Sequence, residues 1–89
     1  MEQIINKVSE YINMPVSVIM SRSRKRDVID ARRIFIYLSY TSGISSAKIS
    51  REIGMTQRCV MWNVETLIGQ MKLYKSINRD VNEIKNAII

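Results

Sequence analysis

The chain has no histidine and only one cysteine, Cys59, among its 89 residues. A single cysteine cannot form an intramolecular disulfide, and a zinc site of the usual Cys/His type lacks its ligands. The commonest general base is missing, no serine or cysteine has a plausible triad partner, and there is no glycine-rich phosphate loop. We therefore expect no catalytic residue, no metal, no cofactor and no small-molecule substrate, and predict that the chain is not an enzyme.

Proline and glycine are scarce, with one and three residues, while 46% of the chain is hydrophobic and 25% charged. This composition is typical of a compact globule and not of a disordered tail. The length suits one small core but not an additional nucleotide-binding domain. No run of about eighteen apolar residues occurs, and the N-terminus begins an amphipathic pattern instead of a leader. We expect a single domain over residues 1–89, cytoplasmic and with no membrane partner.

The charge that is present is concentrated in one stretch. The formal net charge is +6, and residues 22–58 contain nine Lys/Arg against three Asp/Glu, whereas the remainder balances at five against five. The densest part is residues 21–26, which read Ser-Arg-Ser-Arg-Lys-Arg. A charge run is by default a solvated face, but local basicity of this kind also favours nucleic-acid binding.

Apolar residues recur at spacings of three and four along the chain, which predicts helices. An amphipathic helix is expected over residues 2–13 and a short helix over 16–20, on either side of the single proline. The basic run then follows as a loop. A central helix with Asp27 as its N-cap should extend over 27–41, and Gly43 is well placed to terminate it.

Two helices joined by a very short connection come next. Ser45 is a natural cap for a helix that stops at Gly54, and Thr56 can cap the following helix after only two more residues. Helices joined this tightly fit a helix-turn-helix, at about residues 45–69. A final amphipathic helix should start at Ser76. We predict an all-α fold of about six helices with no β-strand.

The second helix of this pair has two unlike faces. At 100° per residue, Val60, Val64 and Leu67 fall on one side, whereas Arg58 and Trp62 fall roughly opposite. The arginine and the tryptophan should therefore face outward. The tryptophan can pack against another helix, contact DNA or anchor a protein partner, and of these we place packing first.

The first turn of the same helix carries groups that can read DNA. Arg58 can contact guanine and Gln57 adenine in the major groove, while Thr56 can touch a phosphate or a thymine methyl group. Spacing alone equally allows Gln57 and Arg58 to be solvated residues of a first turn. Cys59 and Met61 are expected to pack or to lie at the helix edge, without a chemical role.

Three separate segments contribute positive charge: the loop, the central helix and the first helix of the tight pair. An arginine from a loop can enter the minor groove while a helix fills the adjacent major groove. The candidate DNA-binding residues are Arg22, Arg24, Lys25, Arg26, Arg32, Arg33, Lys48, Thr56, Gln57 and Arg58.

These motifs, in this order, resemble the C-terminal DNA-binding domain of the bacterial replication initiator DnaA over nearly the whole chain. Residues 21–26 resemble that family's basic loop, and residues 31–34, Ala-Arg-Arg-Ile, its central helix. Residues 43–45 and 49–54 are similar to its Gly-Leu-Ser and Ile-Gly-Arg-Glu-Leu-Gly segments. The resemblance implies a helix-turn-helix bundle that binds double-stranded DNA.

One segment departs from the family pattern. In that family the arginine matched by Arg24 enters the minor groove, and an Arg-Asp-His-Thr-Thr-Val segment reads the major groove. Here residues 55–60 are Met-Thr-Gln-Arg-Cys-Val. Of the family's pattern, only the valine, Val60, and the glycine before the segment, Gly54, are kept. The resemblance therefore implies that Arg24 keeps its role and that the target sequence differs from the initiator's own box.

Two hypotheses of function follow from these observations. The first is a sequence-specific duplex DNA-binding protein that regulates transcription or replication. The chain begins at the domain's first helix, so we expect neither the initiator's ATPase nor its helicase-loading region. The alternative is a protein-interaction module on the same scaffold that uses the face around Trp62 and Met61, and the last helix could also form a homodimer.

Overall fold

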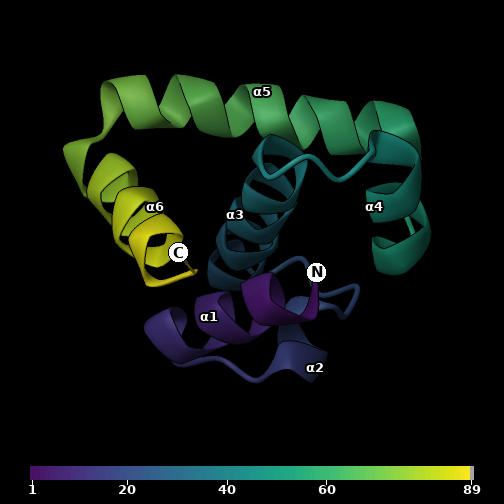
Figure 1. Ribbon diagram of the computed structural model, residues 1–89, viewed down its shortest axis with the longest axis horizontal. Helices are drawn as coiled ribbons and strands as arrows, with labels where there is room; N and C mark the ends of the chain where they lie inside the picture. The colour runs from purple at the N-terminus through teal and green to yellow at the C-terminus, as the bar shows by residue number, and fades with distance from the viewer. Residues whose placement is uncertain (89) are drawn as a thin grey trace.

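The computed structural model describes residues 1–88, and within them the chain folds into helices without a strand. The elements are α1 (Glu2–Ile12), α2 (Val16–Ile19), α3 (Arg26–Thr41), α4 (Ser46–Ile53), α5 (Gln57–Leu73) and α6 (Lys75–Ile88). Helix α3 stands in the middle, α5 lies across one end of it with α4 and α6 at the two ends of α5, and α1 and α2 cover the other end of α3 (Figure 1). The predicted all-α fold is confirmed.

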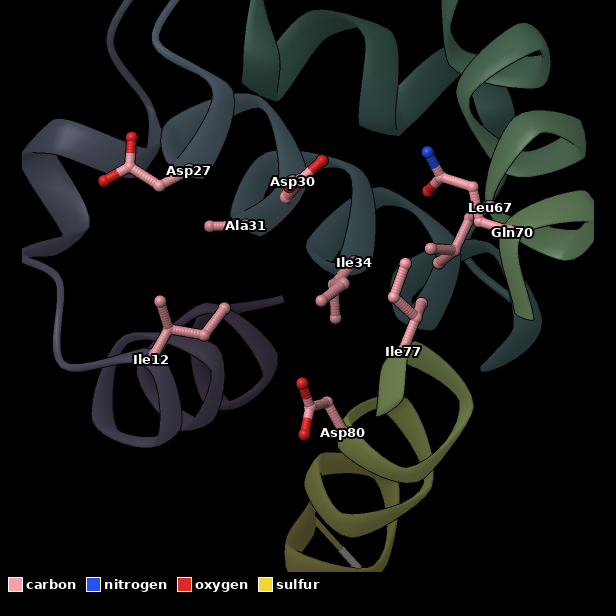
Figure 2. A pocket seen from close by; sticks show the side chains of 9 residues that line it. All are labelled: Ile12, Asp27, Asp30, Ala31, Ile34, Leu67, Gln70, Ile77 and Asp80. Carbon is pink, nitrogen blue, oxygen red and sulfur yellow. The ribbon is translucent and has the colours of Figure 1, made fainter. Parts of the chain in front are cut away.

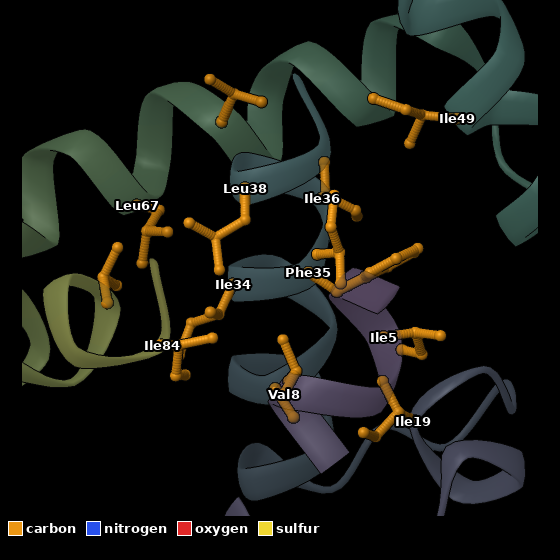
Figure 3. Packing of buried hydrophobic residues seen from close by; sticks show 14 of the residues in the cluster. Ile5, Val8, Ile19, Ile34, Phe35, Ile36, Leu38, Ile49, Leu67 and Ile84 are labelled. Carbon is orange, nitrogen blue, oxygen red and sulfur yellow. The ribbon is translucent and has the colours of Figure 1, made fainter. Parts of the chain in front are cut away.

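The core surrounds α3 because this helix is apolar on more than one side. Phe35 and Ile36 are adjacent in sequence and both are fully buried, since α1 and α2 pack on one side of α3 and α5 on another. Figure 3 shows these side chains meeting residues from the other helices, including Val8, Ile19 and Ile49. The apolar stripe predicted for α5 is buried at Val60, Val64 and Leu67.

The predicted C-terminal ends of α3 and α4, each at a glycine, are confirmed by their backbone geometry. Gly43 takes a φ of 103° after α3, and the N–H of the next residue, Ile44, donates to the Ser39 carbonyl at 3.2 Å. Gly54 ends α4 with a φ of 74°. Positive φ strains residues that carry a Cβ, which is why glycine serves at both places.

Both predicted caps of the helix-turn-helix are also formed. The Ser45 hydroxyl oxygen accepts from the Lys48 N–H at 3.2 Å, and the Thr56 hydroxyl oxygen accepts from the Cys59 N–H at 3.1 Å. Each bond satisfies an N–H group that lacks a partner at a helix start. The Ser45 cap fixes the start of α4, and the Thr56 cap fixes the α5 side of the short turn that begins at Gly54.

Two predicted helix starts are wrong: the N-cap of α3 is Lys25 and not Asp27, and α6 begins one residue before Ser76. Helix α3 begins at Arg26, and Asp27 lies in its first turn, where the carboxylate accepts from the Val28 N–H at 3.0 Å. A carboxylate is favourable anywhere in a first turn because unpaired N–H groups point toward it. Helix α6 begins at Lys75 and not at Ser76, because the Tyr74 carbonyl already accepts from the Asn78 N–H.

Within residues 1–88, none of the helices combines the length and the apolar character needed to cross a bilayer.

Candidate nucleic-acid interface

The first turn of α5 presents Thr56, Gln57 and Arg58 to solvent. Thr56 is the N-cap, so its hydroxyl oxygen already accepts a backbone hydrogen bond while its O–H remains able to donate. Arg58 and Trp62 both lie exposed on the outer face, as predicted, and Val60 between them is buried. The start of α5 therefore presents hydrogen-bond donors to solvent on one face, while Val60 on the opposite face anchors the helix in the core.

Ser46 orients the first residue of α5. Its hydroxyl donates to the side-chain carbonyl of Gln57 at 3.2 Å, which links the first turn of α4 to the first turn of α5. The carbonyl end of the Gln57 amide is thereby engaged, and its NH₂ group is left to donate. Sequence reasoning missed this contact because the two residues belong to different helices and only the folded turn brings them together.

Trp62 lies over the side chain of Arg33, which the sequence places among the DNA contacts. The guanidinium carbon of Arg33 is 5.4 Å from the centre of the indole ring, within range of a cation–π interaction. Its Nε donates to the side-chain carbonyl of Asn63 at 3.1 Å, and the residue is only 8% exposed. Burial lowers the pKa of Arg33. This arginine therefore joins α3 to α5, whereas 57% of Trp62 stays accessible.

Arg32 is also engaged inside the protein. Its guanidinium donates to three backbone carbonyls, those of Ile19 at 3.0 Å, Ser23 at 3.1 Å, and Ser21 between them. These carbonyls belong to the end of α2 and to the basic loop. Burial lowers the pKa of Arg32. The fork of donors thus holds the loop against α3. Arg32 and Arg33, two of the candidate DNA-binding residues, both make hydrogen bonds inside the protein.

The basic loop itself is exposed and shaped by its serines. The N–H of Ser23 donates to the Ser21 hydroxyl oxygen at 3.3 Å, and the N–H of Lys25 donates to the Ser23 hydroxyl oxygen at 3.3 Å. Arg22, Arg24 and Lys25 point into solvent. These small side chains let the loop turn tightly while its long cationic side chains remain available.

Arg26 and Lys48 extend the exposed positive charge onto two helices. Arg26 opens α3 and makes an ion pair with Asp30, with 3.4 Å between Nε and Oδ1, but its side chain is 81% exposed. Such exposed pairs are weak and leave the arginine able to exchange partners. Lys48 lies exposed in the first turn of α4.

One groove joins the basic loop to the helix-turn-helix. It has a volume of about 260 Å³ and is lined by Arg22 and Arg24 from the loop, Arg32 from α3, and Gly54 and Met55 from the turn between α4 and α5. Two segments that are far apart in sequence are thus brought side by side. The loop cations thus lie beside the turn that precedes α5. We use the name reading surface for the exposed candidate residues of the loop and of the first turn of α5: Arg22, Arg24, Lys25, Thr56, Gln57 and Arg58.

Comparison with known proteins identifies this arrangement. The family described as the bacterial dnaA protein helix-turn-helix matches residues 1–66, which include the basic loop and the first turn of α5. The chain belongs to this family. The resemblance inferred from the sequence motifs is therefore confirmed.

Curated relatives extend the similarity over the remaining residues. The chromosomal replication initiator protein DnaA of Bacteroides thetaiotaomicron is 33% identical over 98% of this chain. The protein of the same name from Campylobacter concisus is 35% identical over 100% of this chain. The chain covers 19% and 21% of these two relatives, so it spans about a fifth of their length.

Proposed function

We propose that the chain binds double-stranded DNA and reads its sequence. The first turn of α5 enters the major groove, and Arg24 of the basic loop enters the adjacent minor groove. The observation that carries this proposal is the shared groove, because it keeps the loop beside the turn that precedes α5. Homology to the DnaA helix-turn-helix supports the same conclusion.

The residues of the surface divide into three roles. Gln57 and Arg58 read base edges, with Thr56 at a phosphate or a thymine methyl group. Arg22, Lys25, Arg26 and Lys48 contact phosphates. Arg32 acts as a positioning residue, since its donors hold the loop that carries Arg24.

The target sequence differs from that read by the DnaA relatives. The acidic, imidazole and hydroxyl side chains of the family's reading segment are replaced by Thr56, Gln57 and Arg58. Gln57 presents mainly a donor because Ser46 engages its carbonyl, so it favours base acceptors such as purine N7 or guanine O6. We propose a regulator of transcription or replication that acts at such sites.

Selection of bound sequences from a random duplex library at two salt concentrations tests the proposal. A defined motif should be enriched, and the logarithm of affinity should fall with the logarithm of salt at a slope of about −4 if four to five phosphates are neutralised. Binding that is insensitive to salt, or a selected pool without any motif, would contradict sequence reading.

Arg58→Ala and Arg26→Ala separate base reading from phosphate contact. Arg58→Ala should cost about 1–3 kcal/mol on the selected site and relax the preference at one base position. Arg26→Ala should weaken binding to all sequences alike and reduce the salt slope by about one. Equal losses on every sequence for both variants would refute the assigned roles.

A second candidate function rests on Trp62. Its ring is more than half exposed on the outer face of α5, and exposed tryptophans are frequent anchors in protein interfaces. A partner protein that quenches Trp62 fluorescence, together with a failed DNA selection, would favour this interaction module. Quenching by the selected duplex alone would instead place the ring beside DNA.

A further inference from the structure

A second groove lies among α1, α3, α5 and α6, and shares no lining residue with the groove beside the basic loop. Its volume is about 230 Å³, and its floor is apolar. Ile34 of α3 and Ile77 of α6 point toward each other in Figure 2, and Ile12 of α1 lines the same groove. Ligand pockets of roughly 300–1,000 Å³ are usual for drug-sized molecules. This groove is smaller, so its size suits one or two protein side chains.

The rim of this groove is acidic. Asp27 and Asp30 of α3 lie on one side and Asp80 of α6 on the other (Figure 2). Asp30 pairs with Arg26, and Asp80 with Arg79 at 3.6 Å, but both pairs are solvent-exposed and therefore weak.

Tyr11 gathers one more carboxylate on the same side. Its hydroxyl bonds to Asp80 of the rim and to Glu83, so a fourth carboxylate stands beside the three that line the groove. The surface consequently keeps a local negative charge on a chain of net charge +6. An apolar floor under such a rim suits an apolar side chain flanked by cations.

The complementary feature is on the same molecule, at the corner between α5 and α6. Leu73 is 77% and Tyr74 55% exposed, and Lys72 and Lys75 flank them. No acidic residue occurs between positions 66 and 79. Only Tyr74 separates the two helices, so this corner projects from the molecule (Figure 1). It combines the exposed apolar groups and the cations that the acidic groove would accept.

We propose that the chain forms a symmetric dimer in which the corner of each protomer, residues 72–75, docks into the acidic groove of its partner. Gln70 and Ile77 line the groove, so the groove lies within a few residues of the corner. A two-fold axis at this end of the molecule brings each corner to the other protomer's groove and closes the assembly at two chains. Leu73 and Tyr74 pack on the apolar floor, and the lysines face the carboxylates.

Sedimentation velocity of the full chain without DNA, from the micromolar to the millimolar range, measures this association. The wild type should shift from monomer to dimer with concentration, and more weakly at high salt, because the rim contacts are ionic. A corner variant, Lys72→Glu with Lys75→Glu, and a groove variant, Asp27→Lys with Asp30→Lys, should each weaken the dimer about tenfold or more.

Mixing the two variants gives the decisive result. In a mixed dimer the reversed corner meets the reversed groove, and the wild-type corner meets the wild-type groove, so association should return to the wild-type strength. Circular dichroism checks that each variant is folded, and Arg51→Glu on α4 is a control that should leave association unchanged. A wild type that stays monomeric at every concentration, or a mixture that does not recover, would overturn the proposal. Binding of a basic partner protein by a monomer would overturn it too, and none of these outcomes bears on DNA binding.

Discussion

Arg24 and Arg32 are eight positions apart in one basic stretch, yet their surroundings give them different tasks. Arg24 is exposed in a loop held by serine hydroxyls. Arg32 reaches back to the same loop, where carbonyls at the end of α2 and in the loop have no helix partner to satisfy them. A guanidinium offers several donors in a fixed fork, which suits this clasp better than an ammonium group. A positive charge in the sequence therefore indicates DNA binding only where the hydrogen-bond donors of that side chain are not used inside the protein.

Replacing Arg32 should affect stability and DNA affinity together. Arg32→Ala removes the bonds to the Ile19 and Ser23 carbonyls, so the free energy of unfolding should fall by about 1–3 kcal/mol in urea denaturation. DNA affinity should fall equally for all sequences because the loop loses its fixed position. Arg32→Lys should recover only part of both losses. Unchanged stability with a reduced salt slope would instead make Arg32 a phosphate contact.

Ser46 should influence base preference without contacting a base. Ser46→Ala frees the Gln57 carbonyl, so discrimination at the position read by Gln57 should change by about 1 kcal/mol. In a double-mutant cycle, Ser46→Ala should have no effect on base preference once Gln57 is alanine. Ser45→Ala, which removes the neighbouring cap of α4, is the matched control and should lower stability instead. Additive effects of the two substitutions would show that the contact does not set specificity.

At the scale of the helices, the first and last elements are joined by one polar contact. The Tyr11 hydroxyl of α1 donates to Asp80 of α6 at 2.9 Å and also lies against Glu83. The hydrogen bond to Glu83, followed by that to Asp80, raises the pKa of Tyr11 above its usual value. A neutral phenol is therefore favoured in the folded state. The link holds the last turn of α1 against α6, and its Asp80 also lines the acidic groove.

The sign of this shift predicts a loss of stability in alkali. The pKa of Tyr11 is higher in the folded state than in the unfolded chain. The contribution of its hydrogen bonds to the free energy of unfolding is therefore complete below about pH 10 and is lost as the pH rises further. Ultraviolet absorbance should show one tyrosine ionising at higher pH than the others, and Tyr11→Phe should remove that component. Tyr40→Phe serves as the control. Four tyrosines that ionise together would refute the link.

Most of the helices could be predicted because their information is local. Apolar spacing located the longer helices, the single proline located α2, and serine, threonine and glycine located the ends of α4 and the start of α5. The predicted N-cap of α3 was two residues late and the predicted start of α6 one residue late. A carboxylate is favourable at several positions of a first turn, and a backbone carbonyl can accept the first helical hydrogen bond in place of a side chain, so neither start is fixed by one residue type. The arginine clasp and the contact of Ser46 with Gln57 were not predictable, since they join segments that only the tertiary fold brings together.

At the scale of the whole molecule, the fold directs acidic and basic side chains of one stretch of sequence to two different grooves. Asp27 and Asp30 lie inside the basic stretch, so a count of charges along the sequence subtracts them from it. In space they face the apolar groove with Asp80, whereas Arg22 and Arg24 line the groove beside the helix-turn-helix. The reading surface therefore keeps more of its positive field than the sequence count implies, which favours attraction of a polyanion.

The proposed dimer and the proposed DNA binding together fix the form of the target. Helix α5 has 17 residues, about 25 Å, with the reading turn at its N-terminal end and the corner at its C-terminal end. Corners that meet at a two-fold axis place the two reading turns on either side of it, so the bound sites should be inverted repeats with centres about one helical turn, 34 Å, or more apart. Library selection with the wild type should enrich such repeats, whereas the variant with Lys72→Glu and Lys75→Glu should enrich single half-sites. The same single site recovered with both proteins would mean that each chain reads DNA alone, because a dimer that holds two reading turns on one duplex cannot be indifferent to the second half-site.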